Sequence, residues 1–241
     1  MPDPRAARPR VLVLGVYLTF TDTHVANIIS RLRQSRDWLV DQRWIAIGPE
    51  VNAAVADVTV VHQEARAPKF ALLNRLLTTV DAGQYEFVLV CDDDIALPEA
   101  FLDRYLALVQ QYDFSLAQPA RTHDSYIDHP FVEQLDGLTA RHTRFVEIGP
   151  LFSVRRDAAA LLLPFDERSP MGWGYDQAWP CVIEAAGLRM GIVDAVPVSH
   201  ALRKPVAHYR HAEADQARAQ YLATMPHLPY EEAFFIRESH A

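Results

Sequence analysis

The sequence predicts an α/β domain whose central sheet is mostly parallel and flanked by helices. Short apolar runs, typical of strands buried on both faces, alternate with longer segments whose apolar residues recur at helical spacing. Parallel neighbours need helical crossovers of this length, because each strand must start again from the same edge of the sheet. No internal repeat or linker divides the 241 residues, so we expect a single domain.

The first half of the chain predicts the order strand, helix, strand, strand, helix, strand. Residues 11–16 form an apolar run, and Thr21 or Asp22 could cap the helix after it. Pro68 suits the first turn of a second helix, and the run at 87–91 predicts a central strand. The helices carry apolar stripes at Val25, Ile28, Ile29 and Leu32 and at Leu73, Leu76, Leu77 and Val80, with short strands expected between them at 44–47 and 57–61.

The second half alternates less regularly. A helix is expected from Pro98 to about Tyr112, followed by a strand at 114–117. Residues 118–144 lose periodicity and predict a polar excursion of the same domain that faces the substrate. Beyond it we expect a strand at 145–154 interrupted by Gly149-Pro150, helices at 157–163 and 176–187, a loop at 164–175, apolar segments at 190–194 and 196–199, and a loosely packed helix at 212–223.

Three consecutive carboxylates, Asp92, Asp93 and Asp94, follow the run at 87–91. Like charges this close raise one another's pKa unless a cation neutralises them, so the cluster indicates a divalent metal at a strand end, where open α/β sheets bind ligands. Because side chains alternate along an extended chain, we expect Asp92 and Asp94 to share one face and Asp93 to point away. A solvated acidic loop is the alternative, and the apolar strand before the cluster favours the metal site.

Composition excludes several other classes of protein. The net charge of −8 and the lack of a basic run argue against nucleic-acid binding, which depends on neutralising phosphates. The first ten residues are polar, and no run of about 18 apolar residues occurs. We therefore expect neither a signal peptide nor a transmembrane segment, and a cytoplasmic location.

Four features follow one another along the chain: the strand ending in Asp92–Asp94, the Gly-Trp-Gly-Tyr-Asp loop ending at Asp176, a helix after it, and a strand ending at His200. This order resembles the GT-A fold of nucleotide-sugar-dependent glycosyltransferases, with their D-x-D metal motif. Lys69 to Asn74 is similar to the K-x-x-x-x-N segment of those enzymes, and residues 149–156 to their G-x-x-x-x-x-R-R turn. The spacing of D-x-D, W-G-x-D (173–176) and V-D-A-x-x-x-x-H (193–200) most resembles a poorly characterised plant and bacterial family, over residues 10 to about 205.

The resemblance implies a metal-dependent enzyme that moves a sugar from a nucleoside-diphosphate sugar to a hydroxyl of a carbohydrate or other acceptor. Residues 10–97 would form the donor half and 98–205 the acceptor half, with 1–9 a disordered tail and 206–241 a C-terminal extension packed on or near the site. Asp176 would be the general base, which favours inversion. The other implied roles are Asp94, His200 and Asp92 as ligands of Mn²⁺ or Mg²⁺, Lys69, Asn74, Asp92 and Asp93 as donor contacts, and Trp173 and Tyr175 as acceptor contacts.

Other interpretations stay open. His200 could be a structural histidine, Asp176 a helix-end acid favoured by the macrodipole, and Trp173 a packing residue. A haloacid-dehalogenase-like phosphohydrolase would use Asp92 as nucleophile. A non-catalytic binder of nucleotide sugars or carbohydrates would keep the pocket without a base. The chain also departs from the commonest GT-A pattern, because its first strand lacks a polar ending and Tyr175 replaces a carboxylate. The donor sugar, base, acceptor and oligomeric state are not specified.

Overall fold

The computed structural model describes residues 8–204 and 211–241, so most of the expected tail at 1–9 and residues 206–210 of the expected extension lie outside the described residues. The strands are β1 (Arg10–Leu18), β2 (Leu39–Ile47), β3 (Thr59–Gln63), β4 (Phe87–Cys91), β5 (Leu116–Arg121), β6 (Ala140–Thr143), β7 (Leu151–Arg155), β8 (Met190–Val198) and β9 (Ile236–His240). The α-helices are α1 (Val25–Arg33), α2 (Lys69–Leu77), α3 (Phe101–Gln111), α4 (Arg156–Leu162), α5 (Tyr175–Ala185), α6 (His211–Leu222) and α7 (Tyr230–Ala233).

The strands of the described residues form one mixed sheet in the order β3-β2-β1-β4-β7-β5-β8-β6-β9. Strands β3, β2, β1 and β4 are parallel to one another, as is β5 to β8, whereas β7 runs antiparallel to both β4 and β5, and β6 to both β8 and β9. The expectation of a mostly parallel sheet is therefore wrong. An apolar run shows that a strand is buried but does not show its direction. Strand β7 lies between β4 and β5 and is reached through the long segment after β5, not through a helical crossover, so it runs antiparallel to both.

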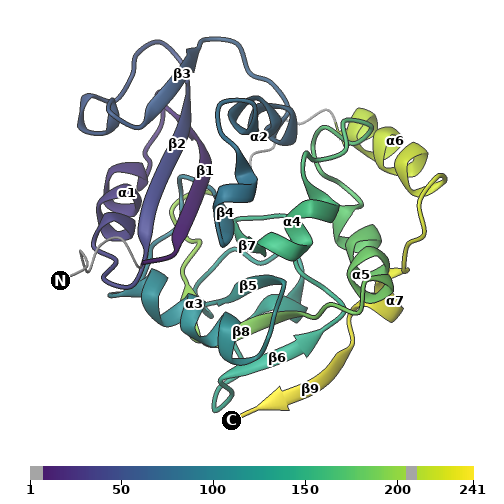
Figure 1. Ribbon diagram of the computed structural model, residues 1–241. Coiled ribbons are helices and arrows are strands. Elements are labelled where there is room, and N and C mark those ends of the chain that lie inside the picture. The colour runs from purple at the N-terminus through teal and green to yellow at the C-terminus, as the bar shows by residue number, and fades with distance from the viewer. Residues whose placement is uncertain (1–7, 205–210) are drawn as a thin grey trace.

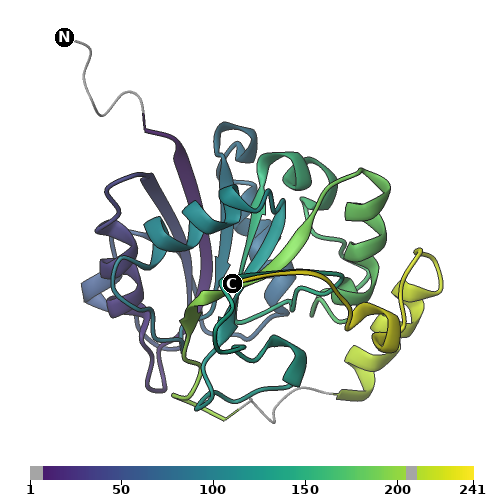
Figure 2. The ribbon, with the colours of Figure 1, turned by 90° about the horizontal axis from the view of Figure 1, so that it is seen from below.

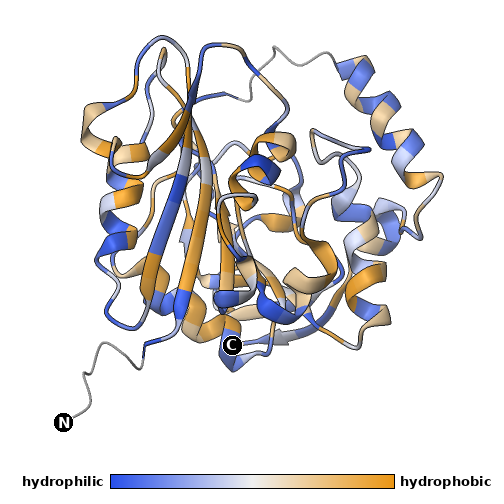
Figure 3. Ribbon diagram, turned by 45° about the horizontal axis from the view of Figure 1, so that its top comes forward, coloured by the Kyte–Doolittle hydropathy of each residue, from blue (hydrophilic) through white to orange (hydrophobic). Residues whose placement is uncertain are grey.

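Helices cover both faces of the sheet (Figures 1 and 2). Helices α1 and α3 pack against one face, and α2, α4 and α5 against the other. All five residues of β4 are buried, which places this strand in the middle of the core. Figure 3 shows hydrophobic residues concentrated in the strands and on the inward sides of the helices. A single α/β domain, as the sequence predicted, follows from one sheet covered by helices on both faces.

Several edge elements differ from the expectation. The two apolar segments after residue 190 form the single strand β8, and the polar stretch 118–144 contains the end of β5 and the whole of β6. Strand β9 from the C-terminal extension pairs with β6 at the edge of the sheet. Within the described part of the chain, no helix is both long enough and apolar enough to cross a membrane.

Candidate active site

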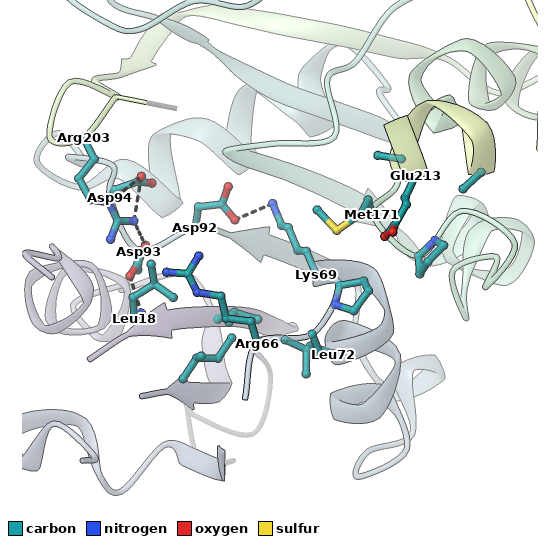
Figure 4. A pocket seen from close by; sticks show the side chains of 17 residues that line it. Leu18, Arg66, Lys69, Leu72, Asp92, Asp93, Asp94, Met171, Arg203 and Glu213 are labelled. Carbon is teal, nitrogen blue, oxygen red and sulfur yellow. Dashed lines mark hydrogen bonds and ion pairs between the residues drawn. The ribbon is translucent and has the colours of Figure 1, made fainter. Parts of the chain in front are cut away.

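A cavity of about 500 Å³ lies where β1, β2 and β4 end (Figure 4). Its apolar wall comes from the strand-end residues Val16, Leu18 and Ile47, and its floor from the three carboxylates after β4. The loop before α2, the loop before α5 and the first half of α6 close the remaining sides. Ligands bind at this edge of α/β sheets, because the strands end there and the loops diverge.

Asp92 faces the start of α2. Its peptide N–H donates to the carbonyl of Pro150 over 2.8 Å, and its Oδ1 lies 2.5 Å from Nζ of Lys69, the first residue of α2. A Cβ atom at Gly149 would lie 3.1 Å from that Nζ and 3.2 Å from Oδ2 of Asp92, so any side chain there would crowd the ion pair. The pair therefore places an ammonium group beside a carboxylate in the lining of the cavity.

Asp93 and Asp94 face a different cation, Arg203. Its guanidinium donates to Oδ1 of Asp93 and lies 2.9 Å from Oδ2 of Asp94, while the N–H of Leu18 donates to Oδ2 of Asp93 over 2.8 Å. The expected alternation, with Asp92 and Asp94 on one face, does not hold. The chain leaves its extended conformation after Cys91, so that Asp93 and Asp94 turn toward the same guanidinium and Asp92 turns away.

The two carboxylates beside Arg203 ionise very differently. Burial raises the pKa of Asp93 to about 6, although the charge of Arg203 and the Leu18 N–H oppose the shift. Burial also acts on Asp94, but the hydrogen bond and charge of His200, together with Arg203, lower its pKa to about 2. Asp94 is consequently the carboxylate whose charge is secured at neutral pH.

Asp94 and His200 fit a divalent cation. Oδ1 of Asp94 lies 3.2 Å from Nε2 of His200, and two ligands about 2.1 Å from one ion at right angles are about 3.0 Å apart. Within the described residues no group of three His, Cys, Asp or Glu side chains could hold a metal, and Asp92 is turned to Lys69. Asp94 and His200 could supply two ligands to such a cation, and other groups, such as water or a bound substrate, would have to complete the shell.

Asp176 lies in the first turn of α5, is almost fully buried, and is not among the residues that line the cavity. Its Oδ2 accepts a hydrogen bond of 3.1 Å from the hydroxyl of Tyr230, whereas its Oδ1 has no partner among the described residues. Burial raises the pKa of Asp176 to about 6 against the opposing effects of Tyr230 and Arg218. A carboxyl group with that pKa can accept a proton near neutral pH.

The remaining expected site residues are scattered. The side chain of Asn74 is buried and exchanges hydrogen bonds of 2.7 and 2.8 Å with the backbone of Phe165, so it fixes the loop before α5 instead of lining the cavity. Tyr175 is buried against Phe70, and its hydroxyl donates to a backbone carbonyl. Trp173 is half-buried beside His211 of α6, with 5.7 Å between the ring centroids.

The aspartate of the V-D-A segment has a structural partner. Asp194 accepts two hydrogen bonds of 2.9 Å from the guanidinium of Arg141 on β6, and both side chains are buried. The pair fixes β6 against β8 and brings no charge into the cavity. Of this motif only His200 reaches the carboxylate cluster.

Sequence reasoning missed four groups near the site. Arg203 and Arg66 line the cavity, and the buried pair Arg121–Glu147 is joined to Gly149 by a hydrogen bond from Arg121 to its carbonyl. Tyr230 reaches Asp176 from α7. Arg203 follows His200 by three residues, so a basic residue shortly after the strand that ends at His200 could have been recognised in the sequence as a partner for the carboxylates. Tyr230 lies 54 residues from its partner and has no local signal.

No family model matches the sequence, and no curated protein resembles it significantly. Solved structures do resemble it. GalNAc-T7, solved with UDP, GalNAc and Mn²⁺, has a TM-score of 0.58 and 12% identity over 84% of this chain and 46% of its own. The mannosyltransferase PcManGT from Pyrobaculum calidifontis, in complex with GDP-Man and Mn²⁺, has a TM-score of 0.56 and 16% identity over 94% of this chain and 68% of its own.

These identities are low, so the likeness shows the fold alone. It confirms the coarse expectation of a single GT-A-like α/β domain with a central sheet between helices. The chain spans less than half the length of the GalNAc-T7 structure. The narrower plant and bacterial family, and the roles of individual residues, stay predictions.

Proposed function

We propose that the protein is a metal-dependent glycosyltransferase that moves a sugar from a nucleoside-diphosphate sugar to an acceptor hydroxyl. The observation that carries the proposal is the cavity at the end of β4, which is lined by both Asp94, the partner of His200, and the cation Lys69. The fold supports it, because both similar structures hold Mn²⁺ with a nucleotide or nucleotide sugar. A cavity of this size suits a ligand of that class.

The donor side divides into an apolar and a charged part. Leu18 and Ile47 offer apolar surface for a nucleoside, and Arg66 and Lys69 extend toward the carboxylates (Figure 4). Asp94 and His200 would hold the divalent cation, which stabilises negative charge on the departing diphosphate when it is bound. Lys69 would contribute the same kind of stabilisation from the opposite side, as a compact charge close to the diphosphate.

The acceptor side is built around Asp176. Its partnerless oxygen and a pKa of about 6 suit a general base that deprotonates the attacking hydroxyl. A base of this kind acting on the acceptor supports a single displacement with inversion. Glu147 lies near both Asp176 and Lys69, since the charges of both act on its pKa.

Binding of nucleoside diphosphates with and without Mn²⁺ is the direct test. We expect calorimetry to show binding of at least one nucleoside diphosphate in Mn²⁺ and a large loss of affinity in EDTA. The same samples should be tested against an aryl phosphate. Steady hydrolysis of that compound, abolished by Asp92→Asn, together with no binding of nucleoside diphosphates, would replace the proposal with a phosphohydrolase.

A further inference from the structure

The two carboxylate oxygens of Asp176 have different surroundings. Oδ2 accepts the hydrogen bond from Tyr230, and Oδ1 is buried without a partner among the described residues. A buried carboxylate oxygen without a hydrogen bond is costly, and folded proteins rarely leave one so. A purely structural acid at a helix start would be expected to use both oxygens. The peptide N–H groups of Asp176 and Gln177 stabilise the carboxylate, but Oδ1 has no hydrogen-bond partner of its own and can accept one from a donor group of a ligand.

Tyr230 is held firmly enough to orient this carboxylate. Its ring stacks on Phe234 with 5.2 Å between centroids, lies 5.1 Å from the ring of His129, and has the guanidinium of Arg218 at 5.6 Å. Helix α7, which carries Tyr230, lies beside α5 (Figure 1). Two hydrogen bonds, of 2.9 and 3.1 Å, join Leu228 just before α7 to Gln177 of α5.

We propose that Tyr230, from the C-terminal segment 211–241, is a positioning residue for acceptor activation: its hydroxyl holds Oδ2 of Asp176 so that Oδ1 receives the acceptor. This inference rests on the proposed function. The acceptor O–H proton passes to Oδ1 while the acceptor oxygen bonds to the anomeric carbon. The bond from that carbon to the diphosphate breaks, and its electron pair leaves with the diphosphate.

The charges around Asp176 set the direction of the expected effects. Burial raises its pKa most, the Tyr230 hydroxyl and Arg218 of α6 lower it, and the peptide N–H groups of Asp176 and Gln177 lower it further. Glu147 is near enough to feel the charge of Asp176, but burial raises its own pKa to about 8, and His129 contacts both Glu147 and the Tyr230 ring. Loss of the Tyr230 hydroxyl removes a stabiliser of the charged form, so the pKa of Asp176 must rise.

The variant Tyr230→Phe keeps the ring and removes only the donor. The pKa of Asp176 can be measured directly by carbon-13 NMR titration of labelled aspartate carboxyls, with the signal assigned by its absence in Asp176→Asn. We expect Tyr230→Phe to raise this pKa by about one unit, since hydrogen bonds to charged groups are worth that much or more. The matched control Tyr221→Phe makes the same exchange on α6, beside Tyr175 instead of Asp176, and should leave the pKa unchanged.

The rate of sugar transfer gives a second readout. A rise from about 6 to about 7 moves the acidic limb of the pH–rate profile upward, so Tyr230→Phe should be slower by about five-fold at pH 6 and about two-fold at pH 7, with little loss at pH 8.5. Donor affinity should be unchanged. An unchanged pKa of Asp176, or a rate loss equal at all pH values, would overturn the positioning role. Failure of the proposed function would appear separately, as no binding of nucleoside diphosphates by the wild-type protein.

Discussion

The exchange Asp94→Asn tests the metal assignment with the least change in shape. Asp94 lies between His200 and Arg203, and its pKa of about 2 means that the carboxylate is charged at any ordinary assay pH. Asparagine keeps the size of the side chain and one oxygen but removes the charge. Because Asp94 is one of only two protein ligands in the proposed site, we expect the variant to weaken metal-dependent binding by about 100-fold or more.

The effect on thermal stability can be worked out from that change. A nucleoside diphosphate at about 100 times its dissociation constant adds about 2.7 kcal/mol to the free energy of unfolding. For a domain of this size, that corresponds to a rise in Tm of about 5–11 °C. After a 100-fold loss of affinity the same concentration equals the dissociation constant, which leaves about 0.4 kcal/mol and about 1–2 °C.

The assay is a thermal-shift titration with nucleoside diphosphates in Mn²⁺ and in EDTA. Asp113→Asn is the matched control, because Asp113 also pairs with an arginine, Arg155. Asp113 precedes β5, which is parallel to β4, and so lies at the opposite end of the strands from the cavity. The control should keep the full shift. Equal shifts in Mn²⁺ and EDTA for the wild type, or an undiminished shift in Asp94→Asn, would refute the metal assignment.

Three further exchanges test other parts of the structure. Lys69→Met should weaken nucleoside diphosphate binding by about 10-fold or more, measured by calorimetry, because it removes a charge at the diphosphate; a loss below about two-fold would contradict this. Asp176→Asn should lower kcat by about 100-fold or more with donor affinity preserved, and near-normal turnover would make Asp176 a helix-end acid. Arg141→Met leaves Asp194 buried and unpaired, so urea unfolding should show a loss of about 3–5 kcal/mol, and a loss under 1 kcal/mol would contradict the pair's structural role.

The sequence predicted the central part of the fold because its signals are local. The apolar run of β4 and the helical stripe of α1 are patterns within single elements, and the structure has both. The second stripe is confirmed in part, because Leu73 and Leu76 are buried, Leu77 is half-buried and Val80 lies beyond the end of α2. Strand β6 was missed because its residues are polar: Arg141 is buried only through its pair with Asp194, 53 residues away. A pattern within four residues cannot show such a partner.

The sequence by itself determined that three carboxylates follow a buried central strand, since both the strand and the cluster lie in one stretch of eight residues. Only the tertiary structure decided what those carboxylates do. It turned Asp92 to Lys69 and brought Asp93 and Asp94 to Arg203, more than 100 residues further along the chain. It also placed Tyr230 on Asp176. The physical reason is that strand direction and side-chain contacts depend on how the chain returns to the sheet, whereas the burial of an apolar strand follows from its own side chains.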